Sequence, residues 1–379
     1  MSSISNSIQQ GNERKILVRS ENWDSGKILC GNVEESYRRE HFHVVDLKLN
    51  KIYSNCLPSL PLACKQGNIV ASGQSIFIFG GWTSIDDKSS LFKFAKSHPE
   101  SHFHMGASRF HFDPADLKDG LVVHGRWAPA PPMNTPHGCI CTCLNGDVYS
   151  VGCNFFSPEV LYVDTTNIEV LGPWKSLVSF PPELHNCTPC YPVIPDPTNN
   201  RILVHFFGGQ LPSPSLYAFY PPDRQNQDDE TGVWRCLNSN LLGWEQVVDA
   251  ALLDGVLFLH GRKFPNLVSA YEVDTGKYLE VQWSSGDIEK DISIDNTYLY
   301  FDSLFCLDDA NKILCLAVYS HIDLRSSVKG GDPNSPSKTI LFFLKFKVKR
   351  CHSSISLTPL DTHSYEIEST TKVLNFLPL

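Results

Sequence analysis

Three side chains with proton-transfer chemistry stand just before apolar stretches of the chain. They are His137, His185 and Glu245, and each belongs to a segment that leads into an expected inner strand. A histidine exchanges protons near neutral pH, so it suits acid–base catalysis better than a carboxylate of ordinary acidity. If the protein is an enzyme, these residues are the candidate acid or base.

A run of alternating cysteines follows His137, at Cys139, Cys141 and Cys143. In a β-strand this spacing places all three thiols on one side, with the first and last about 13 Å apart. Three thiols so arranged cannot bind one metal ion. Cysteine is also a common small buried residue, so the pattern favours packing in a core.

The motif His185-x-Cys187-x-x-Cys190 has a spacing that can hold zinc or form a redox pair. A structural zinc site needs a second pair of ligands, and His137 with Cys139 is the obvious one. A redox pair normally starts a helix, whereas this segment reads as a strand. We therefore favour strand packing with a turn at Pro189, and leave metal binding by these three residues open.

Two further clusters favour ordinary structural roles. His98, His102 and His104 lie in a polar stretch, residues 82–108, which is typical of a solvated loop. The segment Lys345–Arg350 alternates lysines with Phe346 and Val348. It could contact an acidic partner or act as a nuclear signal, but we expect an exposed outer strand whose lysines prevent edge-to-edge association.

Other signatures of enzymes are not found in the sequence. It has no recognisable Ser/His/Asp set, phosphate-binding loop or nucleotide fingerprint. The sequence therefore predicts no cofactor and no metal ion.

The composition argues against several classes of protein. The 379 residues carry a net charge of −9, which does not favour nucleic-acid binding, and 42% are hydrophobic, which is enough for a sizeable core. The first residues are polar, and no apolar run approaches the ~18 residues of a membrane span. Thirteen cysteines, an odd number, indicate free thiols in a reducing compartment. We expect a cytoplasmic protein, possibly also nuclear, with no membrane partner.

A repeated phrase organises the chain: an apolar strand that usually ends in glycine. Its copies recur at intervals of 49 to 72 residues and lie at 26–31, 74–81, 146–153, 201–209, 255–261 and 311–319. A second phrase, alternating and ending in Asp, follows most copies and reads as a strand entering a hairpin turn. No long stretch has helical periodicity, so the sequence predicts an all-β fold.

These phrases resemble the kelch repeat. The stretch 127–152 runs from Trp127 through a proline-rich turn and an inner strand to Asn145-Gly146 and then Val-Tyr-Ser-Val-Gly152. The resemblance implies a six-bladed kelch-like β-propeller, with seven blades as the alternative. It also implies a flexible N-terminus, 1–14, and one domain over 15–379, in which a strand at about 371–379 closes the ring beside residues 15–19.

The resemblance also bears on function. Kelch propellers often carry an F-box or BTB domain, but the residues before the first strand are too few for either. The copper site of galactose-oxidase-like propellers and the iron motif of nitrile-specifier-type proteins cannot be identified here. The resemblance therefore favours a bare binding module.

Three long insertions, 31–41, 82–108 and 320–338, fall between the second and third strands of their blades. In a propeller this places them on one face, together with His137, His185 and Glu245. Long loops on a rigid scaffold commonly carry binding. We expect this face to bind a protein or peptide partner. The alternative is a cofactor-independent lyase, isomerase or cyclase that acts on a small molecule at the mouth of the axial channel.

The odd number of cysteines predicts reduced thiols, and this prediction tests the expected reducing compartment. Alkylation of the native protein without reductant, followed by mass spectrometry, should find most of the 13 cysteines alkylated. Several native disulfides would contradict the predicted reducing compartment.

Overall fold

A computed structural model describes most of the chain. The described residues are 15–23, 28–30, 33–35, 38–54, 56–58, 64–65, 68–79, 82–83, 107–111, 127–131, 133–134, 140–152, 157–163, 172–222, 231–241, 244, 247–261, 267–284, 299–322, 338–368 and 371–378. The predicted N-terminal segment, 1–14, lies outside them.

The prediction of an all-β fold is confirmed, because the described residues form largely antiparallel sheets with no α-helix. The first sheet has the order β28 (Thr371–Pro378), β1 (Lys15–Trp23), β4 (Arg38–Asp46) and β5 (Lys51–Tyr53). The second has the order β7 (Asn68–Ser72), β8 (Ser75–Phe79), β10 (Ala107–His111) and β11 (Ala128–Ala130).

The third sheet consists of β12 (Ile140–Leu144), β13 (Asp147–Val151), β14 (Glu159–Leu161) and β15 (Lys175–Ser176). The fourth consists of β16 (Thr188–Asp196), β17 (Arg201–Phe207), β18 (Ser215–Tyr220) and β19 (Val233–Asn238).

An eight-stranded sheet has two four-stranded halves. One half contains β20 (Val247–Leu253), β21 (Val256–Gly261), β22 (Val268–Glu272) and β23 (Lys277–Trp283). The other contains β24 (Leu299–Asp308), β25 (Ile313–Ile322), β26 (Lys338–Cys351) and β27 (Ser354–Glu368). Parallel pairing of β23 with β27, from Glu280–Ser354 to Trp283–Leu357, joins the halves.

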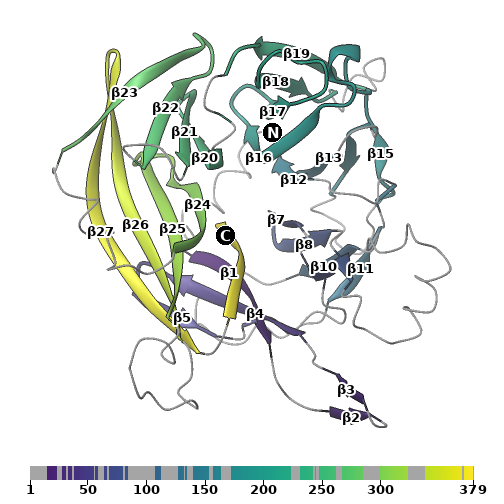
Figure 1. The fold of residues 1–379 in the computed structure, drawn as a ribbon, viewed down its shortest axis with the longest axis vertical. Helices are drawn as coiled ribbons and strands as arrows, with labels where there is room; N and C mark the ends of the chain where they lie inside the picture. Colours follow the sequence, from purple (N-terminus) through teal and green to yellow (C-terminus); the bar gives the residue numbers. More distant parts are fainter. Residues whose placement is uncertain are drawn as a thin grey trace, which may run out of the picture.

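The innermost strands follow one another around a common centre (Figure 1). β7 lies beside β12, β12 beside β16, β16 beside β20 and β20 beside β24; β24 lies beside β28, and β28 beside β7. β28 pairs antiparallel with β1, from Ile16–Pro378 to Asn22–Thr371. The first sheet therefore combines the two ends of the described chain.

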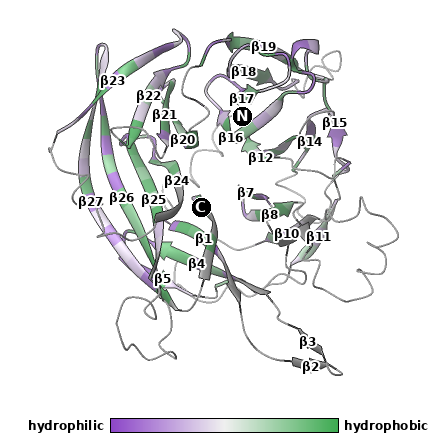
Figure 2. Cartoon of the chain, viewed as in Figure 1, coloured by the Kyte–Doolittle hydropathy of each residue, from purple (hydrophilic) through white to green (hydrophobic). Residues whose placement is uncertain are grey.

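The repeated apolar phrases correspond to strands that are buried on both faces. Every side chain of β8, β13 and β21 is buried. Such strands lie inside a sheet and between neighbouring sheets, which explains why their sequences are continuously apolar rather than alternating. Figure 2 shows the contrast with the more hydrophilic outer strands β15 and β23.

Sequence-encoded turns connect the first two strands of several sheets. Asn145-Gly146 and Asp254-Gly255 both have positive φ at each residue, as a tight two-residue hairpin requires. A longer turn begins at Asp308, whose side chain accepts bonds from the backbone and side-chain nitrogens of Asn311, at 2.8 and 2.6 Å.

Tryptophans and polar bonds join neighbouring sheets. Trp127 Nε1 donates to the Pro58 carbonyl at 2.7 Å, and Trp174 Nε1 donates to the Pro131 carbonyl at 2.9 Å. Each indole therefore reaches back to the preceding sheet while its ring packs on phenylalanines. Arg201 bridges the fourth sheet to Asp274 at 3.1 Å.

Two sequence expectations need correction. Residues 26–31 are not the second strand of the first sheet; β1 takes that place, while β2 (Ile28–Cys30) pairs with β3 (Val33–Glu35) in a separate hairpin. The lysine segment is not an outer edge strand, because β26 lies between β25 and β27. Lys345 is buried and pairs with Asp361 at 2.6 Å.

No helix among the described residues is long and apolar enough to cross a bilayer.

The packing of β28 yields a stability prediction. Phe376 is 7% exposed and meets Phe343 edge to face, with ring centroids 5.7 Å apart. Phe376→Ala should lower the free energy of unfolding by about 3 kcal/mol, since it opens a cavity in this core. Deleting residues 371–379 should lower the melting temperature by several degrees or more.

Thermal and urea unfolding would measure both effects. Leu49→Ala is the matched control, because Leu49 is 50% exposed and its loss should change stability by less than about 0.5 kcal/mol. An unchanged melting curve for the deletion would show that β28 does not stabilise the first sheet.

Candidate functional site

The structure places only one of the three predicted acid–base candidates. His137 and Glu245 lie outside the described residues. His185 is exposed and follows the short 3-10 helix η2 (Pro182–Leu184), just before β16.

Cys187 is a packed thiol next to a close backbone contact. It is 2% exposed, and its Sγ donates to the Gly208 carbonyl at 3.3 Å. A side chain at Gly209, where φ is +60°, would approach Cys187 Sγ to 2.8 Å. The double glycine after β17 therefore permits the chain to pass against the entry to β16.

Neither thiol of the Cys187/Cys190 motif is activated. Burial raises the pKa of Cys187, and it raises the pKa of Cys190 to about 12. A thiolate is the reactive and metal-binding form, so both residues are suited to packing. Among the described residues, no group of three His, Cys, Asp or Glu side chains could hold a metal ion.

The other cysteine and histidine clusters predicted from the sequence lie only partly within the described residues. Cys141 and Cys143 pack against one hydrophobic core, beside Val148 and Leu161. Cys139 and the histidines at 98, 102 and 104 lie outside the described residues. Nine cysteines whose side chains the structure describes are free thiols.

Buried polar side chains gather near the ends of the second strands. Ser150 on β13, His205 on β17, His260 on β21 and Ser320 on β25 are each 4% exposed or less. These ends lead into the connections between second and third strands. Polar side chains are therefore buried beneath these connections.

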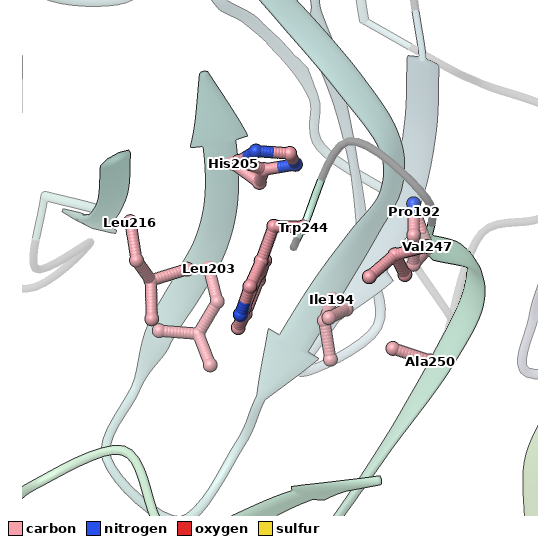
Figure 3. A pocket seen from close by; sticks show the side chains of 8 residues that line it. All are labelled: Pro192, Ile194, Leu203, His205, Leu216, Trp244, Val247 and Ala250. Atoms are coloured by element: carbon pink, nitrogen blue, oxygen red, sulfur yellow. The ribbon is translucent and has the colours of Figure 1, made fainter. Parts of the chain in front are cut away.

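A small cavity lies between the fourth sheet and β20 (Figure 3). Trp244 stands in its centre, with Ile194 and Leu203 beside the ring, and His205 approaches the indole edge at a centroid distance of 5.2 Å. The cavity holds about 10 Å³, the space of one water molecule. It is too small for a substrate, and Trp244 fills most of the gap between the strands.

An irregularity at the start of β20 directs its side chains to two neighbours. The pairing with β21 shifts between Val247 and Asp249, which is the signature of a bulge. Val247 and Ala250 line the cavity toward the fourth sheet, whereas Asp249 points to β24 on the other side. Bulges commonly re-aim a side chain in this manner.

Asp249 connects two inner strands that share no backbone ladder. Its Oδ2 accepts bonds from the Ser303 hydroxyl at 2.7 Å and the Leu304 amide at 2.9 Å, both on β24. Its Oδ1 accepts a bond from the Ala250 amide at 2.8 Å. Burial raises the pKa of Asp249 to about 6, although these donors and the charge of His260 oppose the rise.

His260 links Asp249 to the chain before β22. The two residues pair directly across β20 and β21. His260 Nδ1 lies 2.7 Å from the Leu267 carbonyl, so this nitrogen carries the proton and donates it. Leu267 has a φ of 61°, which costs a bulky residue roughly 1–2 kcal/mol. A hydrogen bond thus holds a strained residue in the connection after β21.

Sequence reasoning did not find Asp249, His260 or Ser303. It selected Glu245, four residues before Asp249, because the entry to an inner strand was the expected position. Asp249 stands alone as a charge within the apolar run 247–253. That isolated charge is the signal that could have identified it, since buried charges are rare.

The raised pKa of Asp249 predicts a pH dependence of stability. A carboxyl that is raised from 3.8 to about 6 binds its proton more readily in the folded state. Its contribution to stability is therefore complete below pH 3.8 and is lost as the pH rises through 6. The loss amounts to about 3 kcal/mol.

Urea unfolding between pH 4 and pH 7.5 would measure this contribution. The difference between wild type and Asp249→Asn should change by about 2.4 kcal/mol across this range. Asp309→Asn, at an exposed turn, is the matched control and should follow the wild type. Parallel curves for wild type and Asp249→Asn would contradict the assignment.

Comparison with known proteins places the chain in no named family. No family model and no curated protein matches it. Among solved structures, a protein from Lactobacillus plantarum is similar over 96% of this chain and 99% of its own, at 12% identity and a TM-score of 0.37.

Proposed function

We propose that the chain is a six-bladed kelch-like β-propeller that binds a protein or peptide partner through one face. The closed succession of β7, β12, β16, β20, β24 and β28 supports this architecture, as each inner strand would begin one blade. The proposed face is the one from which connections between second and third strands emerge.

The observation that carries the binding role is the β2–β3 hairpin beyond the end of the first sheet. β1 and β4 pair without interruption from Lys15–Asp46 to Trp23–Arg38, and β28 accompanies β1 as far as Asn22–Thr371. Among the described strands, β2 and β3 pair only with each other. This hairpin projects outward from the end of β1 and β4 (Figure 1).

The β2–β3 hairpin is a two-stranded sheet of its own. An isolated two-stranded hairpin is at best marginally stable in water. A partner that packs on this hairpin and on the adjacent long connections would supply stabilising contacts.

The remaining features fit the proposed role. We propose a cytoplasmic protein, with the nucleus as a second compartment, consistent with the nine free thiols among the cysteines whose side chains the structure describes. We propose no nucleic-acid partner, since the net charge is −9.

Loop replacement tests this face directly. Replacing residues 24–37 by a short Asn-Gly turn, and residues 86–104 by a Gly-Ser linker, should each preserve the melting temperature but reduce partner capture from a native extract at least tenfold. The double variant His137→Ala and His185→Ala should bind normally if the loops carry the affinity.

The opposite face provides the control. Thr275 lies in the turn between β22 and β23, and Thr275→Ala should leave partner capture unchanged. Undiminished capture by both loop variants, with a loss in the opposite-face variant, would show that binding occurs on the other side.

A further inference from the structure

The long hairpin of β26 and β27 carries a strand edge that the proposed face does not use. β27 lies at the outside of the molecule (Figure 1) and pairs with β26 along its whole length. On its other side it pairs with β23, but only from Glu280–Ser354 to Trp283–Leu357. Among the described strands, none pairs with this side of β27 after Leu357.

Two hydrogen bonds show which backbone groups face this edge. Just beyond β23, Ser284 N donates to the Leu357 carbonyl at 2.9 Å, so Leu357 faces away from β26. On the other side of the hairpin, Val348 N donates to the Lys312 carbonyl at 2.8 Å, so Val348 faces β25. Because successive residues of a strand face opposite ways, the even-numbered residues of β26 face β25 and the odd-numbered ones face β27.

The same alternation identifies the residues further along β27 that face away from β26. β26 pairs with β25 without a register shift, so its alternation is uninterrupted. The β27 partners of its even-numbered residues therefore face the edge, and they are Thr362 opposite Leu344, Ser364 opposite Phe342 and Glu366 opposite Ile340. We call Thr362, Ser364 and Glu366 the outward residues. Each of them presents one N–H and one C=O group to the edge.

Pro359 explains why β23 leaves β27 where it does. Pro359 is opposite Phe346, an even-numbered residue, so it also faces the edge, and it has no N–H to donate. The register then shifts at Leu360. Prolines and bulges commonly end the pairing along an edge strand. Beyond them β27 continues to Glu368 without another proline, so the edge is again complete at the outward residues.

The outward residues are accessible to a partner, since all three side chains are exposed. Leu360 is 48% exposed and Leu49 is 50% exposed. Leu49 adjoins Asn50, whose Oδ1 accepts a bond from the Tyr365 hydroxyl at 3.0 Å, so the turn after β4 lies beside β27. Two exposed leucines therefore lie close to a row of backbone groups that can form hydrogen bonds.

We propose that the outward residues bind an extended segment of a partner protein, which adds to the eight-stranded sheet as a further strand. Backbone groups of the segment bond to those of the outward residues, and its apolar side chains contact Leu360 and Leu49. The pairing of β23 with the first residues of β27 shows that this edge accepts a strand within the chain itself. The surface is separate from the loops of the proposed face, so the inference does not rest on the proposed function.

Charge favours a basic segment over a second copy of this chain. Asp361 is already paired with Lys345 at 2.6 Å, so Glu366 is the charge beside which the added strand lies. A lysine or arginine opposite Glu366 is a favourable cross-strand pair. Two copies of a chain with a net charge of −9 repel each other, which disfavours pairing of β27 with β27.

Amide exchange of the free chain, measured residue by residue by NMR and corrected for intrinsic rates, tests whether the edge is open. Amides of the outward residues should exchange at least about tenfold faster than those of His363, Tyr365 and Ile367, which bond to β26. Equal protection of the two sets would show that another segment of the chain covers the edge, and would overturn the proposal.

Peptides selected on the full chain from a displayed library of short random sequences are the probe for binding. Ser364→Pro removes an N–H that faces the edge and no bond to β26, so the melting temperature should stay close to that of the wild type. Ser364→Ala is the matched control, because it removes the same hydroxyl and keeps the N–H. The peptides should bind Ser364→Pro about tenfold more weakly than the wild type, and Ser364→Ala within about twofold.

Modified peptides carry the test if Ser364→Pro fails to fold. N-methylation of every second peptide amide should abolish binding in one register and retain it in the other, because only alternate amides of an added strand bond to its neighbour. Glu366→Lys should also weaken the binding of basic peptides about tenfold.

The proposal is overturned if the library yields no peptide that distinguishes Ser364→Pro from Ser364→Ala, or if both methylated forms bind equally. Sedimentation of the wild type as a dimer that Ser364→Pro dissociates would identify a second copy as the occupant, and would also overturn it. A variant with residues 24–37 and 86–104 both replaced should bind the peptides as the wild type does. Failure of the proposed face and failure of this edge are therefore separate outcomes.

Discussion

Each sheet buries both of its faces, and this constraint governs the rest of the structure. Second strands such as β8 and β21 have no exposed side chain, so a sheet is stable only between two neighbours. A row of such sheets would leave apolar faces at its ends. Pairing of β28 with β1 removes those ends, because it brings the last strand into the first sheet. Val373 and Phe376 then complete the core beside Phe343.

The contacts between neighbouring sheets are unequal in kind. The two halves of the eight-stranded sheet share a parallel ladder at their outer strands, an ion pair between Arg350 and Glu272, and the bonds of Asp249 at their inner strands. Other neighbours meet through side-chain bonds, such as those of Trp127 and Trp174 to proline carbonyls, and the segment after β15 meets the one before β19 through a backbone bond from Val178 N to the Thr231 carbonyl at 2.9 Å. The β20–β27 region is joined at both its inner and its outer strands.

Polar groups are buried at both ends of the sheets. His205, His260 and Ser320 lie at the ends of their strands nearest the long connections, whereas Asp147 and Arg201 lie at the opposite ends of theirs. Burying these groups lowers stability unless their bonds are satisfied. Asp249 meets this requirement through three donors on β20 and β24.

The sequence by itself determined the all-β class, the strand-turn periodicity and the paired glycines, because strand alternation and hairpin turns depend on residues close together in the chain. Asn145-Gly146 and Asp254-Gly255 form the turns that their types require. Tertiary structure decided the rest. The place of residues 26–31 in a hairpin rather than a sheet depends on β28, more than 300 residues away. The pKa of Asp249 depends on the donors Ser303 and Leu304, which are distant in the sequence, and on how much water the surrounding strands exclude.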